Sequence, residues 1–246
     1  MGNVAPRDGF LQGGKRGDET KEMTAMTTPE PTPIEEILAT GPVLPVVVID
    51  DPAHAVPLAR ALVAGGVRAI EITLRTEHAL EAVRAIAAEV PEAIPGVGTV
   101  LTPADFDAAA AAGAKFAISP GSTPALMDAA WASTLPYVPA VQTASELMGV
   151  MAAGYTVAKF FPAAQAGGVE ALRAFGGPFP TMRFCPTGGV DAQSALAYLA
   201  LPNVLCVGGS WIAPRSAIAA GDFGKIEQLA RAASALRAAR PLRQAV

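Results

Sequence analysis

A strand followed by a helix recurs eight times along this chain, and the repetition constrains the fold more than any other feature. Short runs rich in β-branched residues alternate with alanine-rich amphipathic stretches, about 20 to 25 residues per unit. Several helical stretches end in glycine just before the next strand, as in Ala64-Gly65-Gly66, which is typical of a helix C-cap. Eight right-handed βαβ units allow a parallel sheet to close, so the sequence predicts an α/β fold, a single (β/α)8 TIM barrel.

The predicted strands are almost continuously apolar, as expected for parallel strands that are buried on both faces. They are Val43–Ile49, Ala69–Leu74, Ile94–Thr99, Phe116–Ser119, Tyr137–Val141, Val157–Phe161, Met182–Pro186 and Val204–Val207. The predicted helices between and after them are Ala53–Ala64, His78–Val90, Pro103–Ala112, Pro124–Ala132, Ala144–Ala153, Val169–Phe175, Ala192–Leu199 and Phe223–Ala239. Pro33 with Ile34-Glu35-Glu36 is expected to form a short N-terminal helix that caps the barrel.

Composition indicates one folded domain with an extension. Of the 246 residues, 51% are hydrophobic and 16% are charged, which is enough apolar material for a sizeable core. Residues 1–33 are rich in Gly, Pro, Thr and mixed charge without a hydrophobic period, so we expect a disordered N-terminal extension. The barrel is expected over residues 34–240 and a short C-terminal tail over residues 241–246.

The charge and cysteine content argue against several classes of protein. A net charge of -4 gives no general attraction to nucleic acid or to anionic lipid, so neither is expected as a partner. No apolar run approaches the roughly 18 residues of a membrane span, and no signal peptide is evident, so we expect a cytoplasmic protein. Cys185 and Cys206 lie in apolar stretches and are expected to be buried free thiols, and no zinc-ligand spacing exists.

Polar residues and glycines follow nearly every predicted strand, at the barrel end where active sites lie. They are Glu71 and Arg75-Thr76, Gly98-Thr99, Ser119-Pro120-Gly121, Lys159, Thr187-Gly188-Gly189, and Gly208-Gly209-Ser210.

Lys159 is the most informative single residue, because it interrupts an apolar strand. Desolvation favours the neutral amine, which is the form that attacks a carbonyl. Of the five lysines, Lys15 and Lys21 lie in the extension, Lys225 on the last helix and Lys115 at a strand entrance, so Lys159 is the Schiff-base candidate. A lysine that extends to the rim or pairs with a carboxylate is the alternative.

Glu71 lies inside another apolar strand, where a buried carboxylate needs a partner or a function. Near an inward lysine it could pair electrostatically and move protons, although a purely structural Lys159–Glu71 ion pair remains open. Arg75 offers a planar fork that binds a carboxylate in two places, unless it is an exposed rim arginine.

Two glycine pairs follow the last two predicted strands, where this fold usually has a phosphate site. Gly188-Gly189 and Gly208-Gly209 would let backbone N–H groups point at a phosphate. One such pair alone is more often a simple turn, but two on adjacent strands favour a phosphate site.

These segments closely resemble the family of 2-keto-3-deoxy-6-phosphogluconate aldolase, also called 4-hydroxy-2-oxoglutarate aldolase, from about Ile34 to the last helix. The segments that carry the resemblance are Ala61-Leu62-Val63-Ala64-Gly65-Gly66, Ile70-Glu71-Ile72-Thr73-Leu74-Arg75-Thr76, Gly98-Thr99-Val100-Leu101, Ile118-Ser119-Pro120-Gly121, Lys159-Phe160-Phe161-Pro162-Ala163, Arg183-Phe184-Cys185-Pro186-Thr187-Gly188-Gly189 and Gly208-Gly209-Ser210-Trp211. The chain departs from the family pattern at Val97, Ala140, Gln142 and Ala164, changes that bear on substrate breadth rather than on the chemistry.

The resemblance implies a lysine-dependent aldolase of carbohydrate metabolism, in the Entner-Doudoroff pathway, that works as a homotrimer without metal or organic cofactor. Its substrate would be a small phosphorylated keto acid. It implies that Lys159 forms the imine, that Glu71 is the general acid and base, and that Arg75 and Thr99 bind the pyruvyl carboxylate. The remaining residues implied to contact the substrate or hold its phosphate are Pro120, Phe161, Thr187, Gly188, Gly189, Gly209 and Ser210.

The expected reaction splits 2-keto-3-deoxy-6-phosphogluconate into pyruvate and D-glyceraldehyde 3-phosphate, and 4-hydroxy-2-oxoglutarate into pyruvate and glyoxylate. Three alternatives stay open from the sequence. They are an aldolase for the 6-phosphogalactonate epimer, another phosphate-binding barrel enzyme such as a thiamine-phosphate synthase type, and a non-catalytic barrel that binds a phosphorylated metabolite.

Overall fold

The predicted alternation of strands and helices is present along the described chain. The computed structural model describes residues 33–236. The strands are β1 Val43–Val47, β2 Ala69–Thr73, β3 Ile94–Gly98, β4 Ala117–Ile118, β5 Tyr137–Val138, β6 Ala140–Val141, β7 Val157–Phe160, β8 Arg183–Pro186 and β9 Val207–Gly209. The helices are α1 Pro33–Leu38, α2 Ala55–Ala64, α3 Ala79–Glu89, α4 Pro103–Ala111, α5 Pro124–Ala132, α6 Ala144–Ala152, α7 Gly168–Phe175, α8 Ala195–Leu199, α9 Arg215–Ala219 and α10 Phe223–Ala235, with a 3-10 turn, Pro52–His54, before α2.

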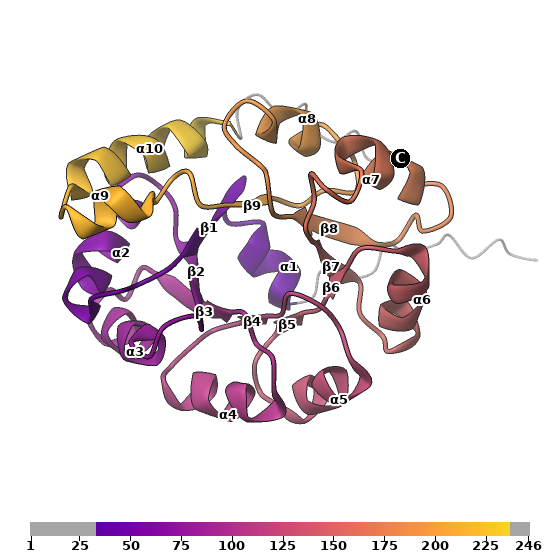
Figure 1. Cartoon of the computed structure of the whole chain (residues 1–246), viewed down its shortest axis with the longest axis horizontal. Coiled ribbons are helices and arrows are strands. Elements are labelled where there is room, and N and C mark those ends of the chain that lie inside the picture. The colour runs from indigo at the N-terminus through magenta and orange to yellow at the C-terminus, as the bar shows by residue number, and fades with distance from the viewer. Residues whose placement is uncertain (1–32, 237–246) are drawn as a thin grey trace, which may run out of the picture. The chain divides into compact units, whose positions relative to one another are not determined.

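The strands form a curled parallel sheet with the helices around its outside (Figure 1). Six strands are hydrogen-bonded in the order β5-β4-β3-β2-β1-β9, and three more in the order β6-β7-β8. Between β8 and β9 the structure has two single parallel bridges, Phe184 with Val204 and Thr187 with Gly208. Because all the strand pairs are parallel, the carboxyl ends of the strands lie together at one end of the curled sheet.

The fifth predicted strand, Tyr137–Val141, is divided into β5 and β6 at Pro139. Proline has no N–H to donate to a neighbouring strand, so pairing is interrupted there. The Pro139 carbonyl still accepts a hydrogen bond of 2.9 Å from the backbone N–H of Lys159, and β6 pairs with β7 so that Ala140 lies opposite Lys159.

Most other bounds agree with the prediction to within two residues, and three elements differ by more. The last strand begins at Val207 rather than Val204, because the bridge between Val204 and Phe184 is isolated and does not continue into the strand. Helix α8 begins at Ala195 rather than Ala192, since the Asp191 carboxylate accepts hydrogen bonds from the backbone of Gln193 and Ser194 and holds them in a turn. Helix α9 was not predicted.

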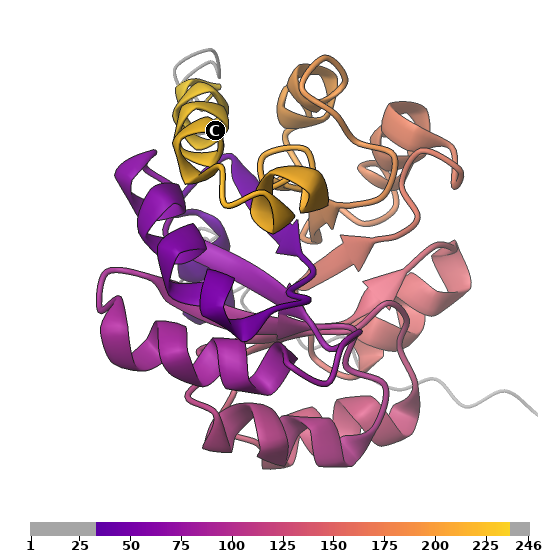
Figure 2. The ribbon, with the colours of Figure 1, turned by 60° about the vertical axis from the view of Figure 1, so that its left-hand side comes forward.

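The last helix, α10, packs beside the first outer helix, α2 (Figure 2). A Cβ atom at Gly65 would collide with Ala230 of α10, so the glycine permits this close approach. The left-handed conformation expected at the end of α2 is adopted by the next residue, Gly66, at φ +89°. Gly113 and Gly154 end α4 and α6 in the same way, both at φ +87°.

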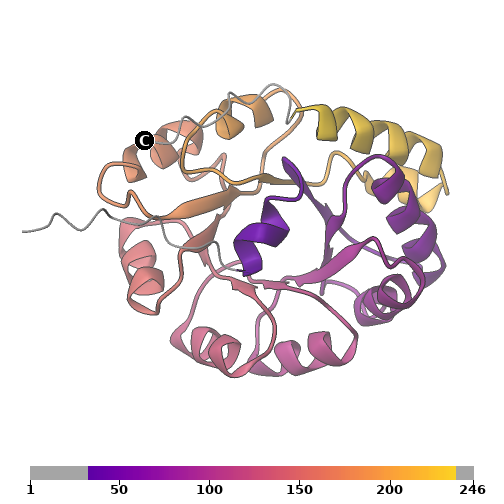
Figure 3. The ribbon, with the colours of Figure 1, turned by 180° about the vertical axis from the view of Figure 1, so that it is seen from behind.

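Buried apolar side chains form two clusters. The larger lies between the strands and the outer helices and includes Leu62, Ile72 and Phe160. The second gathers side chains from six strands, from the segment before β9 and from α1, whose Ile34 and Leu38 are buried in it. Figure 3 shows α1 in front of the ring of strands when the molecule is seen from behind. Strands buried on both faces explain the continuous apolar runs in the sequence.

Cys185 and Cys206 are buried in the second cluster, as predicted, with their sulfur atoms 3.5 Å apart. Within residues 33–236, no helix is long and apolar enough to cross a membrane. The extension predicted for residues 1–33, apart from Pro33, and the tail predicted for residues 241–246 lie outside the described residues, as does the end of the last predicted helix.

Candidate active site

A cleft of about 580 Å³ lies at the carboxyl ends of the strands. It is lined by Val46, Val48, Arg75, Lys159, Phe161, Thr187, Gly188, Gly189, Val190, Gly208, Gly209, Ser210, Trp211, Pro214 and Arg215. Most of the residues implied as a substrate site therefore meet in one cleft. A second cavity, of about 290 Å³, lies near Trp131 and Tyr155, and none of the described residues that line it is charged.

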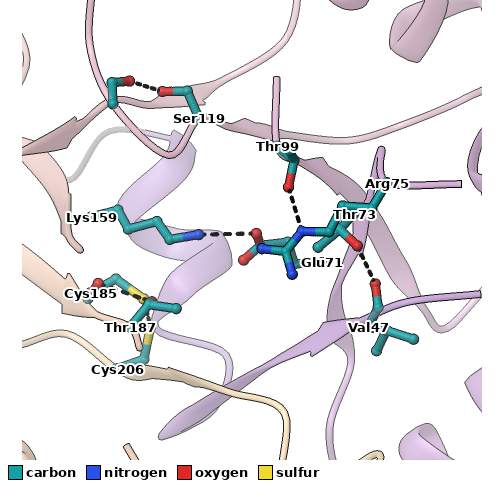
Figure 4. A network of polar contacts seen from close by, with 11 residues as sticks. Val47, Glu71, Thr73, Arg75, Thr99, Ser119, Lys159, Cys185, Thr187 and Cys206 are labelled. Atoms are coloured by element: carbon teal, nitrogen blue, oxygen red, sulfur yellow. Dashed lines mark hydrogen bonds and ion pairs between the residues drawn. The ribbon is translucent and has the colours of Figure 1, made fainter. Parts of the chain in front are cut away.

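Lys159 and Glu71 point toward one another in the interior (Figure 4). The Lys159 Nζ atom lies 3.2 Å from Glu71 Oε1, although the two residues are 88 positions apart in the sequence. Their side chains are 6% and 1% exposed. Both charges have therefore been taken out of water, which is costly unless each compensates the other or takes part in chemistry.

The Glu71 carboxylate owes its position to a glycine. A Cβ atom at Gly98, on the neighbouring strand β3, would collide with Glu71 Oε1, so no other residue type leaves the carboxylate where it is. The second oxygen, Oε2, is buried and has no hydrogen-bond partner among the described residues. An unpaired buried carboxylate oxygen beside an amine is available to exchange protons with a ligand.

Arg75 and Thr99 form a polar pair at one side of the cleft. The Arg75 Nε–H donates to Thr99 Oγ1 at 3.3 Å, as Figure 4 shows. Thr99 has φ +62°, and it is the only non-glycine residue with positive φ in the described chain. A β-branched residue is strained in this region of backbone space, and such strain is concentrated at functional sites. The lysine Nζ is also 5.2 Å from the centre of the Phe161 ring, which places Phe161 beside Lys159 in the cleft.

The glycine-rich turns form the opposite side of the cleft. Gly188 and Gly189 have φ +97° and +71°, a conformation that favours glycine. A Cβ atom at Gly189 would lie 2.6 Å from the Ala164 Cβ, and one at Gly208 would collide with the Thr187 hydroxyl. Glycine at these positions therefore leaves the backbone of the turns without side chains of its own, as anion-binding turns require.

Three residues of the implied site do not line the cleft. Glu71 is hydrogen-bonded to Lys159, and Thr99 is hydrogen-bonded to Arg75; in each pair only the basic residue lines the cleft. Pro120 is half-buried and follows Ser119, whose hydroxyl lies 2.5 Å from the Tyr137 hydroxyl. Burial raises the pKa of Tyr137 to about 12, so this pair stays protonated at neutral pH. Pro120 itself is not among the described residues that line the cleft.

Of the four departures from the family pattern, two lie at the end of the fifth predicted strand or just after it. Ala140 is buried on β6 opposite Lys159, and Gln142 is exposed, with its backbone N–H bonded to Glu146. Neither lines the cleft.

Arg215 lines the cleft and was missed by the sequence analysis. It is the first residue of α9, and its guanidinium donates two hydrogen bonds of 2.5 Å to the carboxylate of Asp50, in the loop after β1. The hydrogen bond from Arg215 holds the pKa of Asp50 below its usual range. Pro214, a typical residue at a helix start, was the one sequence signal that could have indicated α9.

Among residues 33–236 there is no group of three or more His, Cys, Asp or Glu side chains that could hold a metal ion. The chemically active groups that line the cleft are an amine, two guanidinium groups, hydroxyls and backbone N–H groups, and the carboxylates of Glu71 and Asp50 lie beside it.

The sequence was next compared with known proteins. A sequence model described as Aldolase: KDPG and KHG aldolase, where KDPG is 2-keto-3-deoxy-6-phosphogluconate and KHG is 4-hydroxy-2-oxoglutarate, matches residues 34–229. The chain belongs to this family. The KHG/KDPG aldolase of Escherichia coli K12 is 56% identical over 202 residues, which are 82% of this chain and 95% of that protein.

Solved structures of KDPG aldolases have the same fold. The enzyme of Legionella pneumophila, with pyruvate captured at low pH as a covalent carbinolamine intermediate, has a TM-score of 0.81 and 47% identity, covering 82% of this chain and 98% of that one. The enzyme of Zymomonas mobilis ZM4, with 3-phosphoglycerate, has a TM-score of 0.78 and 45% identity, covering 83% and 96%.

Proposed function

We propose that the protein is a class I aldolase that cleaves 2-keto-3-deoxy-6-phosphogluconate to pyruvate and D-glyceraldehyde 3-phosphate through an imine on Lys159. Its second substrate is 4-hydroxy-2-oxoglutarate, which gives pyruvate and glyoxylate. The observation that carries the proposal is the buried pair of Lys159 Nζ and Glu71 Oε1, 3.2 Å apart beside a cleft that has room for a ligand. Membership of the aldolase family and the names of its close relatives support the substrate.

In the first half of the reaction the Lys159 amine adds to the C2 ketone of the substrate. Transfer of a proton from Lys159 to Glu71 across their hydrogen bond leaves the neutral amine that the addition requires. The carbinolamine then loses water, with Glu71 donating the proton to the departing hydroxyl. The product is an iminium ion, which can accept the electron pair of the C3–C4 bond.

In the second half Glu71 takes the proton of the C4 hydroxyl, directly or through a water molecule, and the C3–C4 bond breaks. D-Glyceraldehyde 3-phosphate leaves, and an enamine of pyruvate stays on Lys159. Protonation of the enamine at C3 and hydrolysis of the imine release pyruvate and regenerate the amine. The unpaired Oε2 atom of Glu71 suits this role, because it can exchange protons while Oε1 faces the lysine.

The two sides of the cleft match the two acidic ends of the substrate. Arg75 and Thr99 bind the pyruvyl carboxylate, with the guanidinium fork providing paired donors. The turns at Thr187, Gly188, Gly189, Gly209 and Ser210 hold the phosphate, and Phe161 packs beside the imine. We assign no contact to Pro120.

The proposal extends to the architecture. The curled sheet closes into a complete eight-stranded barrel over residues 34–240, in which β5 and β6 count as one strand and the two bridges join β8 to β9. Helix α1 caps its interior with Ile34 and Leu38. The active enzyme is a homotrimer that needs no added cofactor, and sedimentation velocity of the full chain tests the trimer.

Borohydride trapping tests the imine lysine. Incubation with pyruvate and sodium borohydride, followed by peptide mass mapping, is expected to modify Lys159 alone. Lys159→Met should give no adduct, whereas Lys115→Met, which removes an exposed lysine, should be trapped like the wild type. An adduct on another residue, or none in the wild type, contradicts the assignment.

Glu71→Gln separates acid–base chemistry from imine formation. We expect pyruvate to be trapped slowly, while turnover falls by the 10²- to 10⁴-fold that is typical of a lost acid–base group. Unchanged turnover would make Glu71 structural.

A second experiment tests the sugar configuration by comparing the rates of pyruvate release from 2-keto-3-deoxy-6-phosphogluconate and from its 6-phosphogalactonate epimer. Faster cleavage of the galactonate epimer would overturn the proposed substrate.

A further inference from the structure

Three of the described residues that line the cleft are cationic: Lys159, Arg75 and Arg215. Lys159 faces Glu71, and Arg75 lies with Thr99 at the side proposed for the pyruvyl carboxylate. Arg215 has no part in the mechanism above. It lies six residues after Gly209, at the start of α9, and so belongs to the side formed by the glycine turns.

The pairing of β1 with β9 explains why Asp50 is the partner of Arg215. Pro45 lies opposite Gly209 in this parallel pair, so the loops that follow the two strands leave the sheet side by side. Asp50 and Arg215 meet across these loops, although they are 165 positions apart. Their side chains remain 45% and 68% exposed, at the cleft mouth rather than in its interior.

We infer that Arg215 determines specificity for the phosphate group of the substrate, and that Asp50 competes with that phosphate for the Arg215 guanidinium. The inference rests on the proposed aldolase function and deepens it. An exposed ion pair contributes little net stability, so its exchange for another anion is inexpensive. A phosphate dianion offers three acceptor oxygens and more charge than a carboxylate, and the guanidinium fork suits both.

The competition distinguishes this role from a purely structural one. If the ion pair only holds the two loops together, Arg215→Ala and Asp50→Asn break the same contact and act in the same direction. If Asp50 competes with phosphate, the two substitutions act in opposite directions. Removing Asp50 frees the arginine and takes a negative charge away from the bound phosphate, whereas removing Arg215 takes away the donor.

The kinetic experiment compares two substrates. For 2-keto-3-deoxy-6-phosphogluconate, Arg215→Ala should raise KM about tenfold, the order expected for a lost hydrogen bond to a charged group. Asp50→Asn should lower KM about twofold, the order expected when an exposed ion pair no longer competes. The values for kcat should change little. For 4-hydroxy-2-oxoglutarate neither variant should change KM, because its second carboxylate lies three bonds nearer the imine than the phosphorus of the longer substrate.

Arg231 and Glu227 on α10 provide matched controls. They form an exposed ion pair with side chains 66% and 40% exposed, close to the exposure of Arg215 and Asp50, and neither residue lines the cleft. Arg231→Ala and Glu227→Gln should leave KM for both substrates unchanged. Arg215→Lys, which keeps the charge but not the fork, should recover part of the lost affinity. The inference is overturned if Arg215→Ala changes KM equally for the two substrates. It is also overturned if Arg215→Ala and Asp50→Asn do not change KM for the phosphorylated substrate in opposite directions.

A binding measurement makes the result independent of catalysis. Isothermal titration calorimetry with inorganic phosphate, at fixed ionic strength, should show weaker binding to Arg215→Ala and tighter binding to Asp50→Asn than to the wild type. If phosphate binding follows this pattern but the wild type cleaves neither keto acid, the proposed function is refuted, while phosphate recognition by Arg215 is still supported. Equal phosphate affinity in all three proteins overturns the inference, whatever the catalytic activity.

Discussion

At the scale of single residues, the site depends on steric fit and backbone strain as much as on functional groups. The carboxylate of Glu71 occupies the volume that a side chain at position 98 would need, and Thr99 takes a left-handed conformation immediately after that glycine. Gly98 is the last residue of β3 and Thr99 follows it, so one strand end shapes the surroundings of the acid–base pair and of Arg75.

Gly98→Ala should remove most of the activity without touching a functional group. The added methyl group displaces the Glu71 carboxylate from Lys159, and we expect kcat to fall by about 10²-fold or more. A coupled assay for pyruvate release measures the change. Gly149→Ala is the matched control, because a Cβ there meets no atom within 4 Å and the site is exposed in α6. It should keep kcat and raise the free energy of unfolding by about 0.5–1 kcal/mol. Full activity in Gly98→Ala contradicts the steric argument.

Thr99→Gly and Thr99→Ala separate the hydroxyl of Thr99 from its strained backbone. Both remove the contact with Arg75, so both should raise KM for keto acids. Only glycine relieves the strain at φ +62°, and we expect the glycine variant to unfold with a free energy about 1 kcal/mol higher than the alanine variant. Denaturant unfolding checks this order, and an alanine variant that is equally stable would show that position 99 is not strained.

At the scale of elements, helix starts are specified by local chemistry. Helix α6 has a capping box in which Thr143 and Glu146 satisfy each other's backbone N–H groups, and Thr102 with Asp105 does the same for α4. The Glu146 carboxylate accepts hydrogen bonds from the backbone N–H groups of Gln142 and Thr143. These bonds, chiefly the one from Gln142, lower the pKa of Glu146.

Glu146→Gln should therefore destabilise the protein only when the carboxyl group is ionised. A carboxyl whose pKa is lowered by folding stabilises the folded state above its unfolded pKa, and this contribution is lost as the pH falls through the folded pKa. Near neutral pH we expect the variant to lose about 0.5 kcal/mol, the size of a charge interaction at a helix N-terminus. Below about pH 4, near the ordinary pKa of glutamate, the difference should shrink. Chemical unfolding at several pH values measures it, and a pH-independent difference would rule out the charge as its origin.

At the scale of the whole molecule, the ion pair of Lys159 and Glu71 joins strands of the two hydrogen-bonded sheets. Strand β2 belongs to the six-stranded sheet and β7 to the three-stranded one. Because both side chains are buried, removing one partner leaves a buried charge, whereas removing both leaves none. Stability can therefore be tested separately from catalysis.

Lys159→Met should lower the free energy of unfolding by about 3–5 kcal/mol, because the Glu71 carboxylate is left without its partner. The double variant Lys159→Met/Glu71→Leu should recover most of that loss and remain inactive. Urea unfolding at one fixed protein concentration measures both variants, since association of chains would also affect stability. A double variant as unstable as the single one would indicate that the pair is retained for stability rather than for chemistry.

The sequence by itself determined the alternation of strands and helices, most helix starts and the two buried charged residues, Glu71 and Lys159. These features follow from local rules: hydrophobic periodicity, capping chemistry and the high cost of a charged residue inside an apolar strand. Glu71 and Lys159 were therefore identifiable before their distance was known, and resemblance to a family supplied roles for Arg75 and Thr99.

Only the tertiary structure decided which of these residues meet. The division of the fifth strand at Pro139 depends on pairing with β7, and the requirement for glycine at position 98 depends on a side chain from another strand. Asp50 and Arg215 become partners because β1 and β9 are neighbours, and α9 is too short for periodicity to reveal it. Contacts between distant segments have no local signature, because the free energy that selects them comes from packing the whole sheet.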